Sequence, residues 1–276
     1  MSDAVGAKDK LVVENATKYY DTKSGPLHAV DKFSMSVADG EFACVVGPSG
    51  CGKTTLLWSM AGLHSLTGGT VTLDGEQVTG PHPQIGMVFQ EANLLPWRNL
   101  TKNIQLPFEI KGEKPDHAHI DRLLERVGLT GFGNKFPREL SGGMQQRAAI
   151  VRALSFNPSV LLMDEPFGAL DAFTRDEMNL LVEEIWIETK KTIVFITHNI
   201  AEAVFLSDRV FVMSSRPGRL ARIFDIPFPR PRHLDLFASK EVFDLVNEIK
   251  AEIEHQPSQG ADQSPTTTAA GDRAHG

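Results

Sequence analysis

The amino-acid sequence predicts an α/β fold with a mostly parallel central sheet, an antiparallel β region near the N-terminus and an inserted helical region. Three features indicate it. Short apolar runs alternate with helical patterns from residue 42 to residue 213, turn dipeptides accompany the earlier strands, and residues 92–140 interrupt the alternation with a helical stretch. Near-continuous apolarity is typical of strands that helices cover on both faces.

The N-terminal region is predicted to be antiparallel. Apolar and β-branched residues mark strands at residues 11–17, 33–37 and 70–73. Asp39-Gly40 and Asp74-Gly75 follow two of these strands, and Asp-Gly is a frequent turn sequence between antiparallel strands. We therefore expect an antiparallel β edge on the α/β core.

The core strands and helices follow from apolar periodicity. Five apolar runs indicate buried strands at residues 42–46, 85–89, 160–163, 193–196 and 210–213. Apolar residues recur at helical spacing over 120–127 and 178–186, and Gly128 closes the first of these helices. We expect one domain over residues 1–254, with the helical insertion at about 92–140, and a disordered tail over residues 255–276 that is rich in Gln, Ser, Pro, Thr, Ala and Gly.

The composition restricts the class of protein. The chain has 276 residues, of which 41% are hydrophobic, so it can bury a large core. Its net charge of −7 argues against a nucleic-acid partner, because such proteins usually present a basic face. Cys44 and Cys51 lie in an apolar run and a glycine loop, which favours free thiols in a reducing cytosol. We find no apolar run of the roughly 18 residues that a membrane helix needs and no signal peptide, so we expect a protein that is soluble by itself.

A glycine-rich loop is the strongest functional signal. Residues 47–55, GPSGCGKTT, contain the G-x-x-x-x-G-K-[ST] pattern, follow the strand FACVV and open the helix TTLLWSMAGL. In such a loop backbone N–H groups approach phosphates, the lysine adds charge and the threonine hydroxyl binds Mg²⁺. A glycine-rich turn with a chance lysine is the alternative, which the flanking strand and helix disfavour. The sequence therefore predicts a P-loop NTPase core that binds ATP and Mg²⁺ through Gly47, Pro48, Ser49, Gly50, Cys51, Gly52, Lys53, Thr54 and Thr55.

Two acidic residues follow another predicted strand. The run VLLMDEP carries Asp164 and Glu165 at its end, and ligand sites of α/β sheets lie at the carboxyl ends of the strands. We expect Asp164 to help hold Mg²⁺ and Glu165 to orient or deprotonate the attacking water. The alternative is that the Asp-Glu pair only caps the next turn, and the preceding glycine loop makes the catalytic interpretation the stronger one.

A second loop has the chemistry of an anion site. The sequence LSGGMQQR at residues 140–147 places Ser141, Gly142 and Gly143 at the start of a helix, where free N–H groups and the helix dipole favour negative charge. An ordinary serine-capped helix is the alternative. A second anion site on one chain has no obvious ligand of its own.

The motifs together resemble those of the ATP-binding-cassette (ABC) ATPases. The motifs occur in the order of that family and span most of the chain. They are residues 47–55, Gln90, residues 140–147, Asp164-Glu165, residues 169–171 and His198. The resemblance implies a head-to-tail dimer, in which the signature sequence 140–147 of one chain faces the γ-phosphate held by the glycine loop of the other. Ser141, Gly142 and Gly143 would then bind the nucleotide of a second copy of this chain or of a homologous ATPase subunit.

The same resemblance implies roles for single residues. Tyr20 lies where the family places an aromatic ring against adenine, with Tyr19 as a substitute and β-sheet packing as the alternative for both. Gln90 would reach Mg²⁺ and the attacking water, His198 would contact the γ-phosphate, and Asp171 would signal across the dimer. The alternative for Gln90 is an ordinary solvated glutamine, and the alternative for His198 is a histidine without a functional role.

Two positions depart from the family pattern. Gly168 stands where the family usually has serine, and Met144 stands where it usually has glutamine. Neither change removes a phosphate donor, so we expect hydrolysis to be retained. Communication across the dimer is the property that these changes would affect first.

Two classes of function compete for such a chain: the energising subunit of a membrane transporter, and a cassette ATPase of DNA repair or translation. The single cassette, the lack of a cysteine cluster and the acidic balance favour the transporter. The runs QEANLLPWRNLTKNI and IPFPRPR resemble importers of nitrate, sulfonate, taurine and related small solutes. This resemblance implies a transmembrane permease subunit, an indirect link to a periplasmic or extracellular solute-binding protein, and a peripheral position at the cytoplasmic face of the cell membrane. The sequence leaves the solute open.

The permease surface is expected after Gln90. An apolar cluster interrupts the polar loop there, formed by Leu94, Leu95, Pro96 and Trp97. We expect some of these residues to line a groove for a short helix of the membrane subunit, with packing into their own domain as the alternative. Residues 216–222 are expected to be a solvated surface.

Overall fold

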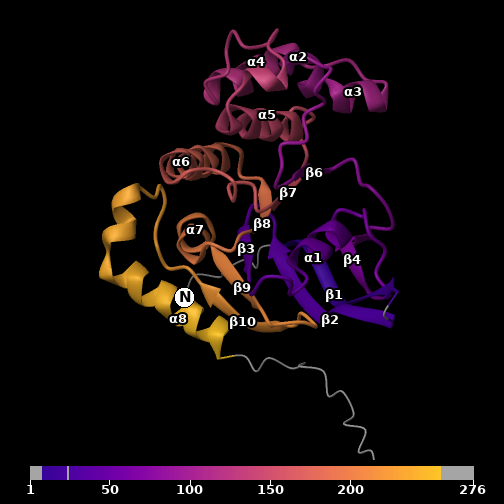
Figure 1. Ribbon diagram of the computed structural model, residues 1–276, viewed down its shortest axis with the longest axis vertical. Coiled ribbons are helices and arrows are strands. Elements are labelled where there is room, and N and C mark those ends of the chain that lie inside the picture. The colour runs from indigo at the N-terminus through magenta and orange to yellow at the C-terminus, as the bar shows by residue number, and fades with distance from the viewer. Residues whose placement is uncertain (1–7, 24, 256–276) are drawn as a thin grey trace, which may run out of the picture.

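The computed structural model describes residues 8–23 and 25–255, and its α/β architecture confirms the predicted fold class (Figure 1). The tail predicted over residues 255–276 lies outside the described residues except for His255, the C-cap of the last helix. The domain limits 1–254 stay a prediction. No helix in the described part of the chain is both long and apolar enough to cross a membrane.

The N-terminal region forms a four-stranded antiparallel sheet with the order β2-β1-β4-β5. Its strands are β1 Asp9–Thr22, β2 Gly25–Ala38, β4 Gly68–Leu73 and β5 Glu76–Gln77. Leu11 pairs with Val37 on one side and with Leu73 on the other. The predicted antiparallel pairing is therefore confirmed, and β1 and β2 extend beyond the predicted strands.

The second sheet has six strands in the order β10-β9-β3-β8-β7-β6. The five predicted core strands are confirmed, as β3 Phe42–Val46, β6 Ile85–Val88, β7 Val160–Asp164, β8 Thr192–Ile196 and β9 Arg209–Met213. These five run parallel, and β10 Leu220–Asp225 adds an antiparallel edge. The prediction of a solvated surface at 216–222 is confirmed for most of the range, since Arg216, Arg219, Ala221 and Arg222 are exposed, although Gly218 is buried and β10 begins at Leu220.

The parallel sheet is buried on both faces, which explains its apolar strands. Along β3, Phe42, Cys44 and Val46 belong to one apolar cluster, and Ala43 and Val45 belong to a second cluster on the opposite face. Successive side chains of a strand point to opposite faces, so a strand covered on both sides must be apolar throughout. The first cluster includes residues of α6 Ala172–Thr189 and α7 Ile200–Leu206, and the second includes residues of α1 Lys53–Met60.

The predicted helical insertion is present as a separate layer at the top of Figure 1. It consists of α2 Leu100–Ile104, α3 Leu106–Lys111, α4 His117–Arg126 and the short 3₁₀ helix η1 Pro137–Glu139. Helix α5 Gly142–Leu154 then leads back to β7. The side chain of Gln146 in α5 donates to the Phe89 carbonyl, which fixes the signature helix to the end of β6.

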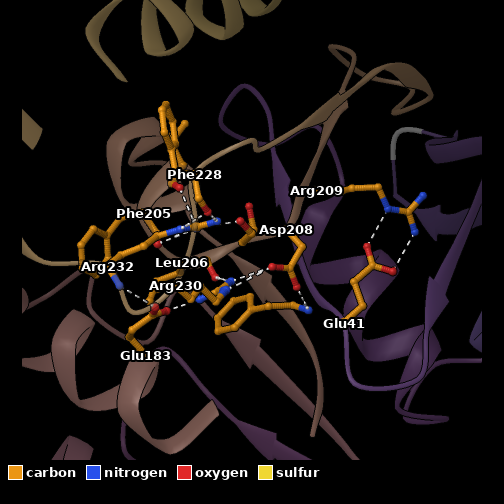
Figure 2. Close-up of polar contacts among 12 residues, drawn as sticks. Glu41, Glu183, Phe205, Leu206, Asp208, Arg209, Phe228, Arg230 and Arg232 are labelled. Atoms are coloured by element: carbon orange, nitrogen blue, oxygen red, sulfur yellow. Dashed lines mark hydrogen bonds and ion pairs between the residues drawn. The ribbon is translucent and has the colours of Figure 1, made fainter. Parts of the chain in front are cut away.

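The C-terminal segment is tied to the core by the buried Arg232 and the half-buried Arg230 (Figure 2). Arg232 is 3% exposed and donates to the carbonyls of Val204, Phe205 and Ser207, which are orphan acceptors near the end of α7. Arg230 pairs with Glu183 of α6 and with Asp208. The chain continues through η2 Leu234–Ala238 to α8 Lys240–Glu254, which packs on α7. The run IPFPRPR, which resembles importer sequences, therefore also has a structural role, because its two arginines hold the C-terminal segment in place.

Candidate functional site

The glycine loop positions a buried lysine at the start of α1. Gly52 is the N-cap of α1 with φ 107°, and a Cβ there would lie 2.7 Å from the Ala29 carbonyl oxygen, so only glycine fits. Lys53 is 6% exposed, and its Nζ donates to the carbonyls of Gly47 at 3.0 Å and Pro48 at 3.1 Å. Because Gly52 has no side chain to cap the helix, N–H groups of the first turn stay available for an anion.

A cavity of about 360 Å³ lies against this loop. Among the predicted nucleotide-binding residues, the cavity is lined by Tyr20, Ser49, Gly50, Gly52, Lys53, Thr54 and Thr55. Gly47 and Pro48 belong to the loop without lining the cavity, and Cys51 is buried behind it. The cavity is also lined by Leu27, Ala29, Glu165 and Arg216, of which only Glu165 was predicted.

The structure distinguishes the two neighbouring tyrosines. Tyr20 lines the cavity, and its hydroxyl lies 3.3 Å from Thr55 Oγ1 and 2.8 Å from His64 Nδ1. Tyr19 points to the other face of the strand and stacks on His28 at a ring separation of 4.0 Å. Tyr20 is therefore the better placed of the two for a base.

Asp164 is a buried carboxylate held by two neutral donors. It is 5% exposed, and it accepts hydrogen bonds from Thr54 Oγ1 at 3.1 Å and from Trp58 Nε1 at 3.2 Å. Burial raises its pKa, and the bonds from Thr54 and Trp58 act in the opposite direction. Within the described ranges Asp164 has no cationic partner at ion-pair distance, and a carboxylate beside a hydroxyl is the oxygen donor set that fits Mg²⁺.

Trp58 is a site residue that the sequence analysis missed. It lies four residues after Thr54 on α1, so the two side chains share one face of the helix and reach the same carboxylate. That spacing was visible in TTLLW. The spacing alone does not predict a functional role, because the role depends on the end of β7 lying beside that face of the helix.

Three other predicted residues converge on Gly168. Glu165 Oε2 lies 3.0 Å from His198 Nδ1. A Cβ at Gly168 would lie 3.6 Å from His198 Cε1 and 3.8 Å from Gln90 Nε2, which is ordinary contact. The structure therefore brings Gln90, Glu165 and His198 to one place beside the cavity, and a serine at residue 168 would also have room for its Cβ.

Behind this cluster lies a buried acid that the sequence analysis did not identify. Glu202, on α7, is 3% exposed, and its Oε1 has no hydrogen-bond partner. Burial raises the pKa of Glu202 to about 7, although Thr197, Arg175 and His198 favour its charged form. Burial therefore favours the neutral form of this carboxyl group.

The signature sequence is a capped helix start that lies apart from the cavity. The Ser141 hydroxyl accepts a hydrogen bond from the Met144 N–H at 3.3 Å, so the serine cap is present. Ser141 and Gly142 are exposed, and neither they nor Gly143 line the P-loop cavity. Met144 is half-buried and packs on the apolar core, which accounts for an apolar residue there.

Asp171 lies next to the signature sequence. Its carboxylate caps α6 by accepting from the N–H and the hydroxyl of Thr174 at 3.1 and 2.7 Å. A Cβ at Gly143 would approach Thr174 Cγ2 to 2.7 Å, so the start of α5 packs directly on this cap. The two motifs therefore form one exposed surface.

An apolar groove of about 380 Å³ lies beside the segment after β6. Its lining includes Met87, Phe89, Leu106, Ile110 and Phe156. The predicted lining residues are not part of it: Leu94 is buried, Leu95 is half-buried, and Trp97 is 72% exposed away from the groove lining. A groove is present in this region, but none of the residues at 94–97 lines it, so the predicted lining is wrong, and a contact with a membrane subunit stays a prediction.

Comparisons with known proteins agree with these motifs. The family model described as "ABC transporter" matches residues 30–168. An uncharacterized ABC transporter ATP-binding protein of Methanocaldococcus jannaschii is 48% identical over 82% of this chain and 85% of that protein. A taurine import ATP-binding protein of Rhizobium johnstonii is 46% identical over 80% of this chain and 85% of that protein.

Solved structures show the same fold. A dimeric ATP-binding cassette in a post-hydrolysis state, bound to ADP and phosphate, has a TM-score of 0.70 and 31% identity, covering 79% of this chain and all of that one. The cbiO1 protein of Clostridium perfringens has a TM-score of 0.71 and 28% identity, covering 87% of this chain and 96% of that one. The motifs, the fold and these relatives together establish that the chain belongs to the ABC transporter family, as an ATPase whose hydrolysis is coupled to transport.

Proposed function

We propose that this chain is the ATP-hydrolysing subunit of an importer for a small solute of the nitrate, sulfonate or taurine class. The observation that carries the proposal is the P-loop cavity, which is lined by the buried Lys53, by Thr54 that binds the buried Asp164, and by Glu165 that pairs with His198. The names of its relatives support the solute class, since they include taurine and aliphatic sulfonate import proteins at 40–46% identity.

Two copies of the chain would share each nucleotide. In the described part of the chain Ser141 and Gly142 are exposed, Gly143 is half-buried, and none of the three lines the P-loop cavity of its own chain. Docking the signature sequence of one copy over the cavity of the other supplies the γ-phosphate with donors that a single chain lacks. The Asp171 cap beside the signature would then lie at the interface. A related cassette has been solved as a dimer bound to ADP and phosphate, which supports this arrangement.

The proposed chemistry assigns one task to each residue. Lys53 places positive charge at the phosphates, and Tyr20 packs on the base. Thr54 and Asp164, with Gln90, would hold Mg²⁺, which when bound neutralises phosphate charge. Glu165 orients the attacking water and accepts its proton, while His198 fixes that carboxylate through the contact of Nδ1 with Oε2 and would face the γ-phosphate.

The apolar groove is the proposed contact with the permease subunit. It lies between β6 and α3, next to Gln90, so a helix seated there would sense movement of the nucleotide site. Contact with a membrane subunit places this chain on the cytoplasmic face of the cell membrane as a peripheral protein. The solute-binding protein is reached only through the permease.

Substitution of Ile110 tests the groove. This residue lines it and is 77% exposed, so Ile110→Glu should leave folding and basal ATP hydrolysis intact. Co-purification with the permease and solute uptake should fall at least about tenfold, as for an interface anchor. Phe243→Glu is the matched control, because Phe243 is 64% exposed on α8 and lies outside the groove. Equal permease binding by both variants would remove the groove from the proposal.

Uptake measurements test the transport role and the solute class. Cells lacking this gene should lose uptake of at least one solute among taurine, alkanesulfonates and nitrate. Wild-type protein should restore uptake, and the Glu165→Gln variant should not. Normal uptake of all three solutes in the deletion strain would contradict the solute class. A loss that Glu165→Gln repairs would contradict coupling to hydrolysis.

A further inference from the structure

The turn between β9 and β10 touches the phosphate-binding loop. Arg216 in this turn donates from Nε and Nη2 to the Gly50 carbonyl oxygen at 2.9 and 2.7 Å. The same side chain lines the P-loop cavity together with Lys53 and Thr54. Residues more than 160 positions apart in the sequence thus form one wall of the cavity.

The turn itself is fixed from several sides. Gly218 donates to the Ala29 carbonyl and accepts from the Asp31 N–H, both at 3.0 Å, which ties the turn to β2. A Cβ at Gly218 would lie 2.3 Å from the Cys51 carbonyl oxygen, so the turn also packs directly on the glycine loop. The backbone that carries Arg216 is therefore held in place before any ligand contact.

The charge of Arg216 has no acidic partner in the described part of the chain. Its neighbour Arg219 pairs with Asp31, whereas Arg216 contacts only a neutral carbonyl. Lys53 is bound in the same way, by the carbonyls of Gly47 and Pro48. The cavity thus presents two cations with neutral partners, and its one lining carboxylate, Glu165, already faces His198.

We propose that Arg216 is a nucleotide-binding residue, whose guanidinium donates to phosphate oxygens from the side of the cavity formed by the β9–β10 turn. Nε and Nη2 hold the Gly50 carbonyl, and the Nη1 group remains to bind an anion. The planar fork of an arginine suits this double contact, which a lysine cannot reproduce fully. The inference rests on the proposed nucleotide site and adds a residue to it.

Equilibrium binding of ATP and ADP to the full chain tests this role. Arg216→Gln should weaken both affinities about tenfold at low salt, a modest value because the side chain is exposed. Arg216→Lys should recover part of the loss. The difference between wild type and Arg216→Gln should shrink at about 0.5 M salt, because screening weakens an exposed charge contact but leaves a packing effect unchanged.

Arg219→Gln is the matched control. It removes a charge from the same turn and breaks the pair with Asp31, but Arg219 does not line the cavity. Wild-type affinity in Arg216→Gln would overturn the inference. A loss that is equal in the two variants and independent of salt would also overturn it, because the turn would then act only as a support. Failure of the wild-type chain to bind ATP, with Lys53→Ala no weaker, would instead contradict the proposed nucleotide site.

Discussion

Helices α1 and α5 both begin beside glycine residues, but the two helix starts differ in how much of a phosphate-binding site surrounds them. At α1 the N-cap Gly52 offers no side chain, so the first-turn N–H groups stay available, and Lys53 is buried among carbonyls of its own loop. At α5 the Ser141 hydroxyl already satisfies one N–H, and Ser141 and Gly142 are exposed. The first lies against a cavity lined by Glu165, Lys53 and Arg216, whereas Ser141, Gly142 and Gly143 do not line that cavity.

The comparison shows that free N–H groups at a helix start do not by themselves make a site. A phosphate site also needs walls that exclude water and charges that favour the anion. In the described part of the chain the cavity at α1 supplies these features. The proposal that the start of α5 completes a site on another molecule rests on this difference, and the predictions below test it.

Removal of the buried cation should have the largest effect. We expect Lys53→Ala to weaken ATP binding at least about a hundredfold and to abolish hydrolysis, because a charged contact to the phosphates is lost in a partly enclosed site. Isothermal titration with ATP measures the affinity. Binding within about threefold of wild type would mean that the cavity around α1 is not the nucleotide site.

Neutralising the glutamate should separate binding from chemistry. We expect Glu165→Gln to lower turnover by about a hundredfold to a thousandfold, since the proton acceptor for water is removed. ATP affinity should stay near the wild-type value because the amide is nearly isosteric. Steady-state hydrolysis and ATP titration on the same preparation check both. Near-normal turnover would exclude Glu165 as the catalytic base.

The tryptophan behind Asp164 should have a moderate effect. Trp58→Phe removes one of the two hydrogen bonds that orient this carboxylate, so the Mg²⁺ dependence of ATP binding should shift about threefold to tenfold to higher Mg²⁺. ATP binding in the presence of a chelator should be unchanged. Trp97→Phe, at an exposed position, is the control for the loss of an indole. Identical Mg²⁺ curves for wild type and Trp58→Phe would contradict the role of Trp58.

The buried acid on α7 should affect stability more than function. Because burial raises the pKa of Glu202 from 4.5 to about 7, the unfolded chain ionises first as the pH rises, and stability falls between these values. The contribution of Glu202 to the free energy of unfolding is therefore fully present below pH 4.5 and is lost by pH 7. We expect Glu202→Gln to be more stable than wild type at pH 8, by an amount on the order of 3 kcal/mol or less. Urea unfolding at pH 5 and pH 8 measures this, and an equal stability difference at the two pH values would contradict it.

The sequence predicted the elements whose local pattern is strong. The apolar runs of β3, β6, β7, β8 and β9 reflect burial on both faces, and the glycine loop has its expected flanking strand and helix. It also predicted the cluster of Gln90, Glu165 and His198, through family order rather than through spacing. That cluster depends on three strand ends meeting at one edge of the sheet.

The residues that the sequence missed depend on distant partners. Arg232 lies in a proline-rich run that looks solvated, and it is buried because carbonyls at the end of α7 need donors. Arg216 looks like surface until the β9–β10 turn is placed on the glycine loop. Likewise, the groove lining comes from β6, α3 and the end of α5 with Phe156 after it, so the nearby apolar cluster at 94–97 was a misleading local signal.

The most direct test of the shared-site account is the oligomeric state of the Glu165→Gln protein with saturating ATP and Mg²⁺, measured by sedimentation. The account predicts a dimer that dissociates when ATP is removed. Adding Ser141→Arg should give a monomer that still binds ATP, because the bulky cation occupies the exposed start of α5 and leaves the P-loop cavity unchanged. A monomer in the Glu165→Gln protein, alone and together with its membrane subunit, or a dimer that Ser141→Arg leaves intact, would contradict the account.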